Sequence, residues 1–271
     1  MAIKMLALDL DGTLLTSQRV IDPETAKYLA QVAKTGVKVV LTSGRPLSGV
    51  MPFEEELGLS GRGNYAIVFN GAVIQALDGH EMMSQNLDYH DFQAMKRVAR
   101  LADVNTTFET THGFYTYDRH LGVQQMLDAV FTRNTLDVLE KEAFPQDFTF
   151  NKAGFTCQRE SDEIEKMWQA LPEWVFDRYN VVRSYHHVIE IGPQGTSKGL
   201  AVSILAANLG LSENEVAVFG DQGNDLSMFE NPNFYKVAMG NAIEAIKAQA
   251  DYVTTDHDDH GVLKAVKKLV E

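Results

Sequence analysis

The 271-residue sequence contains a single cysteine, Cys157. One cysteine cannot form an internal disulfide, which excludes a disulfide-stapled scaffold and suits a reducing cytoplasm. No catalytic sequence signature surrounds Cys157, so we interpret it as a packing residue.

Long apolar runs and basic charge are also scarce. No stretch approaches the ~18 consecutive apolar residues of a membrane span, and the N-terminus lacks the basic and apolar segments of a signal peptide. Lysine and arginine number 24 against 37 acidic residues, giving a net charge of −13. Such a chain is poorly suited to nucleic acid or an anionic membrane. These absences predict a soluble cytoplasmic protein with a small-molecule partner, as a monomer or a homodimer, in which an anionic substrate needs a local cation or metal.

The first distinctive stretch is an apolar run, Ile3–Leu8, that leads directly into Asp9, Asp11 and Gly12. The run is typical of a strand buried on both faces in a parallel sheet. In an open α/β sheet, ligands bind beyond the carboxyl ends of the strands. Two carboxylates this close repel each other, which favours a bound cation or a raised pKa on one of them.

The first third of the chain alternates strands and helices, which predicts a parallel sheet with crossover helices. Asp22 can cap the first helix, Pro23 suits its first position and Gly36 can end it. The predicted elements are a strand at 3–8, an extended flap at Leu14–Val20, a helix from Pro23 to Gly36, a strand at Lys38–Thr42, a helix from Pro46 to about Leu57 and a strand at Tyr65–Phe69.

From about Asp88 to His186, aromatic and polar residues alternate, as in an antiparallel sheet with one covered face. The predicted strands here are Asn105–Glu109, Gly113–Tyr117 and Phe148–Thr156, and the earlier alternation then resumes with strands at His187–Ile191, Val216–Gly220, Tyr235–Ala238 and Tyr252–Thr254. The fold class is therefore α/β: a doubly wound, Rossmann-like parallel-sheet core (residues 1–86 and 188–271) with an inserted α+β cap (residues 87–187).

Polar side chains follow further predicted strands and begin helices. Ser43 follows the strand at Lys38–Thr42, where a hydroxyl and backbone N–H groups near a helix N-terminus can hold an anion. Lys198 stands in the first turn of the helix that Ser197 can cap, where a cation opposes the helix dipole unless an anion is bound. Each feature alone also fits an ordinary Ser-Gly turn or a solvated lysine.

A second pair of carboxylates, Asp221 and Asp225, follows the apolar run Val216–Gly220. Alone, this pair also fits an acidic turn that caps a helix. Together, the carboxylates indicate a hard cation such as Mg²⁺, and no set of cysteine and histidine residues suits zinc. A lysine and a hydroxyl beside Mg²⁺ make a phosphate site.

The acidic and histidine-rich segment at residues 256–260, Asp-His-Asp-Asp-His, resembles a metal cluster at first sight. Carboxylates and histidines are common at turns. We interpret the segment as a solvated loop before the last helix.

The combined motifs resemble those of the haloacid-dehalogenase-like phosphatases: D-L-D-G-T at Asp9–Thr13, T-S-G-R at Thr42–Arg45, Lys198, and G-D-Q-G-N-D at Gly220–Asp225. Their order, with the long insert between Ser43 and Lys198, is similar to the Cof-type branch with a large α+β cap (type IIB). The resemblance covers essentially the whole chain, by motif in the core and by topology alone in the cap. It is specific for the superfamily and much less so for the substrate.

This resemblance implies a role for each matching residue. Asp9 corresponds to the nucleophile that forms an aspartyl-phosphate, and Asp11 to the general acid and base. Ser43 and Lys198 correspond to the residues that hold the phosphate. The implied Mg²⁺ ligands are Asp9, Asp11 through its backbone carbonyl, Asp221 and Asp225, the last directly or through another ligand. The remaining implied phosphate- or substrate-binding residues are Leu10, Gly44, Arg45, Asn70, Gly71 and Asn224.

The expected function is a Mg²⁺-dependent phosphatase of small phosphorylated metabolites, foremost sugar phosphates. A phosphosugar mutase, similar to phosphomannomutase, shares the core motifs and stays open. A phospho-accepting switch module is a third interpretation, against which stand Asp11 and the long insert. Several residues of the insert could line a substrate pocket, although each is more simply a packing or surface residue: His112, Tyr115, Tyr117, His120, Arg183, Tyr185, His186 and His187.

Overall fold

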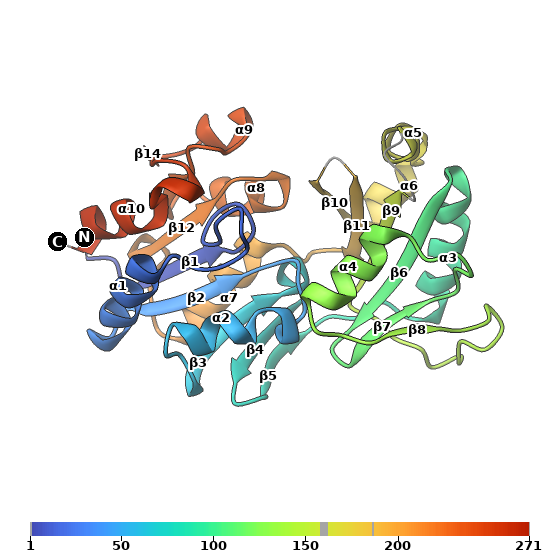
Figure 1. Ribbon diagram of the computed structural model, residues 1–271, viewed down its shortest axis with the longest axis horizontal. Helices are drawn as coiled ribbons and strands as arrows, with labels where there is room; N and C mark the ends of the chain where they lie inside the picture. The colour runs from blue at the N-terminus through green and yellow to red at the C-terminus, as the bar shows by residue number, and fades with distance from the viewer. Residues whose placement is uncertain (1, 158–161, 186, 271) are drawn as a thin grey trace. The chain divides into compact units, whose positions relative to one another are not determined.

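The structure, a computed structural model, describes residues 2–157, 162–185 and 187–270. The chain divides into two compact units. The core unit consists of Met1–Gly44, Val50–Met83 and Ser197–Glu271, and the insert unit of Arg45–Gly49 and Ser84–Thr196. Each unit has its own β-sheet covered by helices (Figure 1).

The core unit is built on an eight-stranded sheet with the order β14-β13-β12-β1-β2-β3-β4-β5. The strands are β1 (Met5–Asp9), β2 (Lys38–Thr42), β3 (Gly61–Val68), β4 (Val73–Leu77), β5 (Glu81–Ser84), β12 (Val216–Gly220), β13 (Tyr235–Ala238) and β14 (Tyr252–Val253). From β14 to β3 all neighbours are parallel, and β4 pairs antiparallel with β3. The chain runs outward from β1 in both directions, so the doubly wound fold class is confirmed and β1 lies at the switch point, where such sheets bind ligands.

The described residues of the core unit form six α-helices: α1 (Pro23–Lys34), α2 (Met51–Glu56), α7 (Lys198–Asn208), α8 (Leu226–Phe229), α9 (Glu244–Lys247) and α10 (Gly261–Val270). The start of α1 is as predicted, because the Asp22 side chain accepts a hydrogen bond from the Thr25 N–H at 2.9 Å. Ser197 caps α7 in the same way, accepting from the Leu200 N–H at 3.2 Å. The capping residues therefore set both helix starts.

The single helix predicted from Pro46 to about Leu57 is wrong. The chain forms a 3₁₀ turn at Leu47–Gly49 and begins α2 afresh at Met51. The turn packs within the insert unit, where Asn134 Nδ2 donates to Ser48 Oγ at 2.8 Å. Pro52 explains the break locally, because proline is tolerated in the first turn of α2 but would remove a hydrogen bond and clash with the preceding turn inside one continuous helix.

The insert unit has a six-stranded sheet with the order β10-β11-β9-β6-β7-β8. Its strands are β6 (Val104–Thr110), β7 (Gly113–Thr116), β8 (Leu136–Val138), β9 (Lys152–Cys157), β10 (Tyr179–Tyr185) and β11 (Val188–Pro193), and its helices are α3 (Tyr89–Val98), α4 (Val123–Phe131), α5 (Glu163–Ala170) and α6 (Glu173–Arg178). All pairs are antiparallel except β7 with β8. This is the expected α+β architecture.

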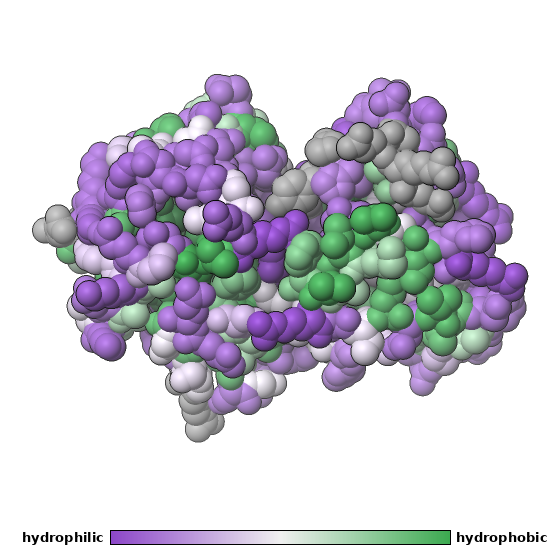
Figure 2. Space-filling view, in the orientation of Figure 1, coloured by the Kyte–Doolittle hydropathy of each residue, from purple (hydrophilic) through white to green (hydrophobic). Residues whose placement is uncertain are grey.

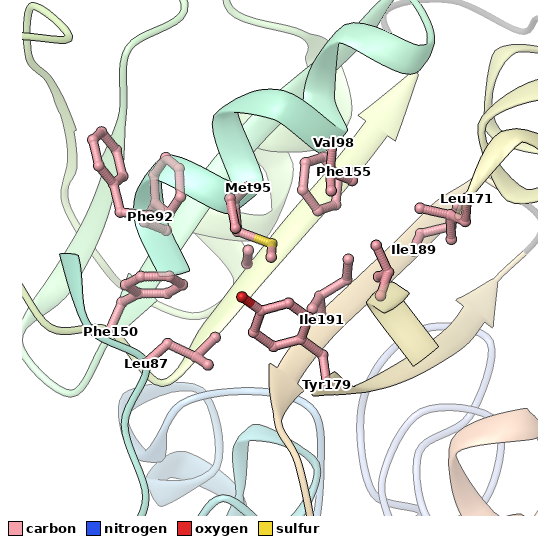
Figure 3. Close-up of a cluster of buried hydrophobic side chains, with 14 of the residues drawn as sticks. Leu87, Phe92, Met95, Val98, Phe150, Phe155, Leu171, Tyr179, Ile189 and Ile191 are labelled. Atoms are coloured by element: carbon pink, nitrogen blue, oxygen red, sulfur yellow. The ribbon is translucent and has the colours of Figure 1, made fainter. Parts of the chain in front are cut away.

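One face of this second sheet packs on an apolar cluster that includes Phe92, Met95, Phe155, Ile189 and Ile191 (Figure 3). The last two residues belong to β11, which pairs antiparallel with β9. The sequence pattern had placed this strand where the parallel alternation resumes. Local alternation cannot identify the partner of a strand, and here the apolar face of β11 completes the cluster of the insert unit.

The opposite face of the second sheet is polar and mostly buried. Lys152 Nζ lies 3.1 Å from Glu109 Oε2 and also contacts Glu190, whose other oxygen accepts from Ser184 Oγ. Burial raises the pKa of Glu109 to about 8, against the opposing charge of Lys152. Three strands are thus joined by a buried ion cluster.

An apolar surface on α4 is visible on the insert unit (Figure 2), formed by Val123, Met126, Leu127, Val130 and Phe131, which are 37–68% exposed. Within the described ranges, no helix is long and apolar enough to cross a membrane.

Candidate active site

The carboxyl end of β1 carries the first carboxylate, Asp9, which is 5% exposed. Gly12 then turns the chain with a φ of +82°, and a Cβ at this position would lie 2.5 Å from Asp221 Oδ2. Only glycine satisfies both the left-handed backbone and this close approach. The turn after β1 therefore rests directly on the carboxylate that follows β12.

Lys198, at the start of α7, joins two of the acidic positions. Its ammonium nitrogen lies 2.5 Å from Asp9 Oδ1 and 2.7 Å from Asp225 Oδ1, and its side chain is fully buried. The other oxygen of Asp225 accepts the backbone N–H groups of Asp221 at 2.9 Å and Gln222 at 3.1 Å. Asp225 thereby fixes both the lysine and the turn after β12.

The start of α7 is itself held by a close backbone approach. A Cβ on Gly71 would lie 2.2 Å from the carbonyl oxygen of Ser197. Since Gly71 also has a φ of +93°, a glycine is required here for two reasons. The turn after β3 thus packs against the residue that precedes Lys198.

Three carboxylates lie together at this site, and the Lys198 ammonium contacts two of them, Asp9 and Asp225. Oxygens of Asp9, Asp221 and Asp225 lie within 4.8 Å of one another, and all three residues are buried. Burial raises the pKa of Asp9 well above its ordinary value; the charges of Asp225 and Asp221 act in the same direction and Lys198 opposes them. Burial and the charge of Asp225 raise the pKa of Asp221 to about 7. The cluster carries more negative than positive charge when ionised, which a cation would neutralise.

The same carboxylates also shift the pKa of Lys198. Burial acts to lower its pKa, but the carboxylates of Asp225 and Asp9 outweigh that influence, so the pKa of Lys198 is raised and the side chain stays charged. The donor set of Asp9, Asp221 and Asp225 is all-oxygen, as hard cations such as Mg²⁺ prefer, and it includes none of the cysteine or histidine ligands typical of structural zinc sites.

The ends of β2 and β3 are tied to each other beside this cluster. The backbone N–H of Asn70 donates to the Ser43 carbonyl at 3.0 Å, and Asn224 Nδ2 donates to Asn70 Oδ1 at 3.2 Å. Thr42 turns its hydroxyl toward the sulfur of Met228 at 3.9 Å, into the core. Ser43 and Gly44, which approaches the Asn70 amide, therefore lie with Asn70 and Asn224 in the core unit.

Two residues implied to bind substrate have other surroundings. The Leu10 side chain is fully buried, and its carbonyl accepts from the Leu15 N–H at 2.9 Å. Arg45 belongs to the insert unit, where its guanidinium donates to the Gly49 carbonyl at 3.3 Å. Asp11 is half-buried in the turn after β1.

The candidate pocket residues of the insert divide between packing and surface. Tyr115 and Tyr117 pack against the apolar cluster, and His112 and His120 are exposed. Arg183 pairs with Glu165 at 2.6 Å. His187 is half-buried next to β11. The side chain of Tyr185 and all of His186 lie outside what the structure describes.

Two residues at the site had no role assigned from the sequence: Thr13, which ends the D-L-D-G-T motif, and Asn241, which lies in none of the motifs. Thr13 Oγ1 donates to Asp221 Oδ1 at 3.2 Å. Asn241 Nδ2 donates to the Gly12 carbonyl at 2.8 Å and lies 3.4 Å from Asp221 Oδ2. The signal for Asn241 was available, because it follows the carboxyl end of the strand predicted at Tyr235–Ala238, as the other site residues follow theirs.

The core is doubly wound and carries an α+β insert, and a lysine lies among buried carboxylates at the switch point of the sheet, where enzymes of this architecture bind their ligands. The chain belongs to the family of haloacid dehalogenase-like hydrolases, whose sequence profile matches residues 6–266.

Individual relatives agree with this assignment over their full length. A protein of Streptococcus pyogenes serotype M6 is 32% identical, covering 100% of this chain and 99% of its own. The Bacillus subtilis phosphatase YwpJ is 31% identical, covering 99% and 100%. A solved haloacid dehalogenase-like hydrolase from Bacteroides thetaiotaomicron superposes with a TM-score of 0.85 at 28% identity, covering 98% and 99%. The predicted family, the fold and the class of enzyme, a phosphatase, are confirmed.

Proposed function

We propose that this chain is a Mg²⁺-dependent phosphatase that hydrolyses small phosphorylated metabolites, sugar phosphates foremost, through an aspartyl-phosphate on Asp9. The observation that carries the proposal is the Lys198 ammonium held between Asp9 and Asp225 at the carboxyl end of β1. It keeps Asp9 beside a positive charge that an incoming phosphate can share. The acidic net charge of the chain offers no other general attraction for such an anion.

The residues present fit a magnesium ion. Asp9 and Asp221 would hold it with the backbone carbonyl of Asp11. Asp225 would orient Lys198 and the turn, because one of its oxygens accepts the Lys198 ammonium and the other accepts two backbone N–H groups. When bound, the ion would neutralise the carboxylates and the phosphate and so lower the barrier to their approach.

The residues of the chain then divide the work of two displacements at phosphorus. Lys198 and Ser43 hold the phosphoryl oxygens while the Asp9 carboxylate attacks and forms the acyl phosphate. Asp11 donates a proton to the leaving oxygen. In the second displacement, Asp11 takes a proton from the water that attacks the acyl phosphate and frees Asp9.

The predicted cap, residues 87–187, would recognise the organic part of the substrate. Support for a polyol or sugar comes from three Bacillus subtilis relatives, 27–28% identical, that are named 5-amino-6-(5-phospho-D-ribitylamino)uracil phosphatases. The phosphate of that compound sits on a ribityl chain. Sugar phosphates and ribityl phosphates therefore both belong among the candidate substrates.

A screen of phosphorylated metabolites tests the proposal, with release of inorganic phosphate as the readout in Mg²⁺, in Zn²⁺ and with a chelator. We expect release from sugar or ribityl phosphates in Mg²⁺, loss of activity with the chelator and recovery on adding Mg²⁺. No release from any member of the panel would contradict the proposal, and a preference for Zn²⁺ would contradict the assigned ion.

Product analysis separates the alternatives. A mutase would convert a hexose phosphate into its isomer without releasing phosphate. A switch module would accumulate as a stable phosphoprotein after incubation with a small phosphodonor. A hydrolase gives free sugar and inorganic phosphate in equal amounts, with no stable phosphoprotein.

A further inference from the structure

We propose that Asn241 is a positioning residue that holds the Asp221 carboxylate and the turn after Asp9 in one arrangement. The segment at residues 256–260, which we call the latch turn, then holds the flap at Leu14–Val20. The inference rests on the proposed function, because it concerns the site at which Mg²⁺ would bind. Asn241 belongs to none of the motifs identified in the sequence, and the composition of residues 256–260 alone predicts only a solvated loop.

Asn241 lies directly after β13, the neighbour of β12 in the sheet. Its amide nitrogen donates to the Gly12 carbonyl at 2.8 Å and faces Asp221 Oδ2 at 3.4 Å. Thr13 approaches the other oxygen of the same carboxylate at 3.2 Å. One amide group therefore links the turn after β1 to the carboxylate after β12, and the Asp221 side chain has a donor facing each oxygen.

The acceptor side of Asn241 connects to the latch turn. Its Oδ1 accepts the His257 N–H at 3.2 Å. Asp258 then binds Ser17 twice, accepting the backbone N–H at 2.7 Å and the hydroxyl at 2.5 Å. Ser17 lies in the flap at Leu14–Val20, which is closed at its base by the bridge between Leu15 and Ile21.

A second contact holds the base of the flap. His260 Nδ1 lies 3.1 Å from Asp22 Oδ1, the carboxylate that caps α1. The latch turn thus binds the segment between Asp11 and α1 at two places, Ser17 and Asp22. These contacts join residues far apart in the sequence: Ser17 and Asp258 are 241 positions apart, and Gly12 and Asn241 are 229 positions apart.

These contacts also account for the metal-like composition of the latch turn. Both oxygens of Asp258 are used by Ser17. Asp256 Oδ1 accepts the Asp258 N–H at 3.0 Å and lies 3.0 Å from His257 Nδ1. Side chains that could ligate a cation are instead used to shape the turn and hold the flap, so the segment is an anchored turn and no metal site is proposed there.

The link matters because Asp221 lies among like charges. Without a donor on its Oδ2, repulsion from Asp225 and Asp9 favours other side-chain orientations of Asp221 and weakens the preformed arrangement for a cation. Outer partners of metal ligands commonly change metal affinity by about 10–100-fold when removed. The same loss frees the Gly12 carbonyl and relaxes the turn that presents Asp11.

The test compares Asn241→Ala with Asn231→Ala in the full-length protein, with Mg²⁺ alone as the probe in calorimetry. Asn231 is a matched control: it is also half-buried, its Nδ2 faces Ser203 Oγ at 3.2 Å and Glu213 Oε1 at 3.0 Å, and its Oδ1 accepts a backbone N–H from Asn233 at 2.9 Å. We expect the Mg²⁺ dissociation constant to rise about tenfold or more in Asn241→Ala and to stay unchanged in Asn231→Ala. In activity assays, kcat of Asn241→Ala should recover substantially as Mg²⁺ is raised.

The latch turn is tested by tryptic cleavage after Arg19, in the flap. Ser17→Ala and Asn241→Ala should both increase the cleavage rate by about fivefold, the effect of losing hydrogen bonds of ordinary strength, and Asn231→Ala should not. Circular dichroism confirms folding, and Asn241→Ser replaces the alanine variant if that variant does not fold.

An Asn241 variant that binds Mg²⁺ within about twofold of the wild type, or an equal loss in Asn231→Ala, would overturn the positioning role. Unchanged cleavage after Arg19 in Ser17→Ala would overturn the role of the latch turn. If the wild type releases phosphate from no substrate while Asn241→Ala still weakens Mg²⁺ binding, the proposed function fails and the positioning role stands. If the wild type is an active phosphatase and Asn241→Ala binds Mg²⁺ normally, the positioning role fails and the proposed function stands.

Discussion

Lys198 Nζ lies 2.5 Å from Asp9 Oδ1, although 189 residues separate the two along the chain. The pair joins the central strand of the core sheet to the first residue of α7, beyond the whole insert. A buried ion pair alone is weak support for stability, since removing two charges from water costs as much as their attraction provides. The position at the switch point of the sheet instead favours a catalytic reason for it.

Replacing this lysine is the first prediction. Lys198→Met leaves three buried carboxylates without a protein cation, so phosphate release should fall by about 10²–10³-fold, as for the loss of one preorganised charge at a phosphoryl or oxyanion site. Lys267→Met is the control, because that lysine forms an exposed pair with Glu24 at 3.1 Å. A steady-state rate of phosphate release by Lys198→Met within tenfold of that of the control would contradict a catalytic role for Lys198.

A second prediction separates the two carboxylates after β1. Asp11→Asn should slow hydrolysis of sugar phosphates by roughly 10²–10⁴-fold, the range of general acid–base help. Nitrophenyl phosphate should be affected less, because its leaving group needs little protonation. Equal losses on both substrates would argue against Asp11 as the proton donor.

A third prediction concerns a buried acid outside the site. Glu54, on α2, is fully buried, and among the described residues neither carboxylate oxygen has a partner at hydrogen-bonding geometry. Burial raises the pKa of Glu54 from its ordinary 4.5 to about 8, with only partial opposition from the Leu41 backbone. The folded protein then keeps a proton that the unfolded chain releases between these two pH values.

The direction in which stability changes with pH follows from this retained proton. Because the folded state binds more protons, the free energy of unfolding decreases as pH rises from about 4.5 to 8, by up to ~1.4 kcal/mol per pH unit from this group alone. Glu54→Gln should remove this contribution and gain stability over the wild type toward pH 8, measured by denaturant titration at several pH values. Glu55→Gln, at an exposed position on the same helix, should leave the pH profile unchanged. A parallel profile for both variants would show that Glu54 does not titrate in this window.

A fourth prediction tests the ion cluster of the insert unit. Lys152→Met leaves Glu109 and Glu190 buried without their cation and should cost about 3–5 kcal/mol of stability, as for breaking a buried pair. Lys166→Met removes an exposed partner of Glu163 and should cost at most about 1 kcal/mol. Denaturant unfolding of the two variants measures the difference, and similar small losses would mean that the buried lysine is dispensable.

The sequence predicted the central features of the core because each is encoded locally. The strand at Lys38–Thr42 has the predicted bounds, and the caps Asp22 and Ser197 begin their helices as expected. The site residues Asp9, Lys198 and Asp225 meet because parallel strands end at one edge of a sheet. The sheet topology therefore brings together residues that the motifs identify only by their order along the chain.

Most of the features that were missed depend on long-range contacts. The 3₁₀ turn at Leu47–Gly49 contacts Asn134, although Pro52 already marks the break before α2 in the sequence. β11 pairs with β9 and packs in the apolar cluster of the insert unit. Asn241 follows a predicted strand, but its partners Gly12 and Asp221 become apparent only when β13 pairs beside β12. The latch turn likewise shows its purpose only once Asp258 meets Ser17, because the composition of a turn does not reveal what it binds.

The most direct test of the account is phosphate release by Asp9→Asn on the best substrate of the screen, in saturating Mg²⁺. The substitution is nearly isosteric but removes the charge and the nucleophilic oxygen. With circular dichroism confirming the fold, the account predicts a loss on the order of 10⁴-fold or more. Release within about tenfold of the wild type, from pure protein, would contradict Asp9 as the residue that accepts the phosphoryl group.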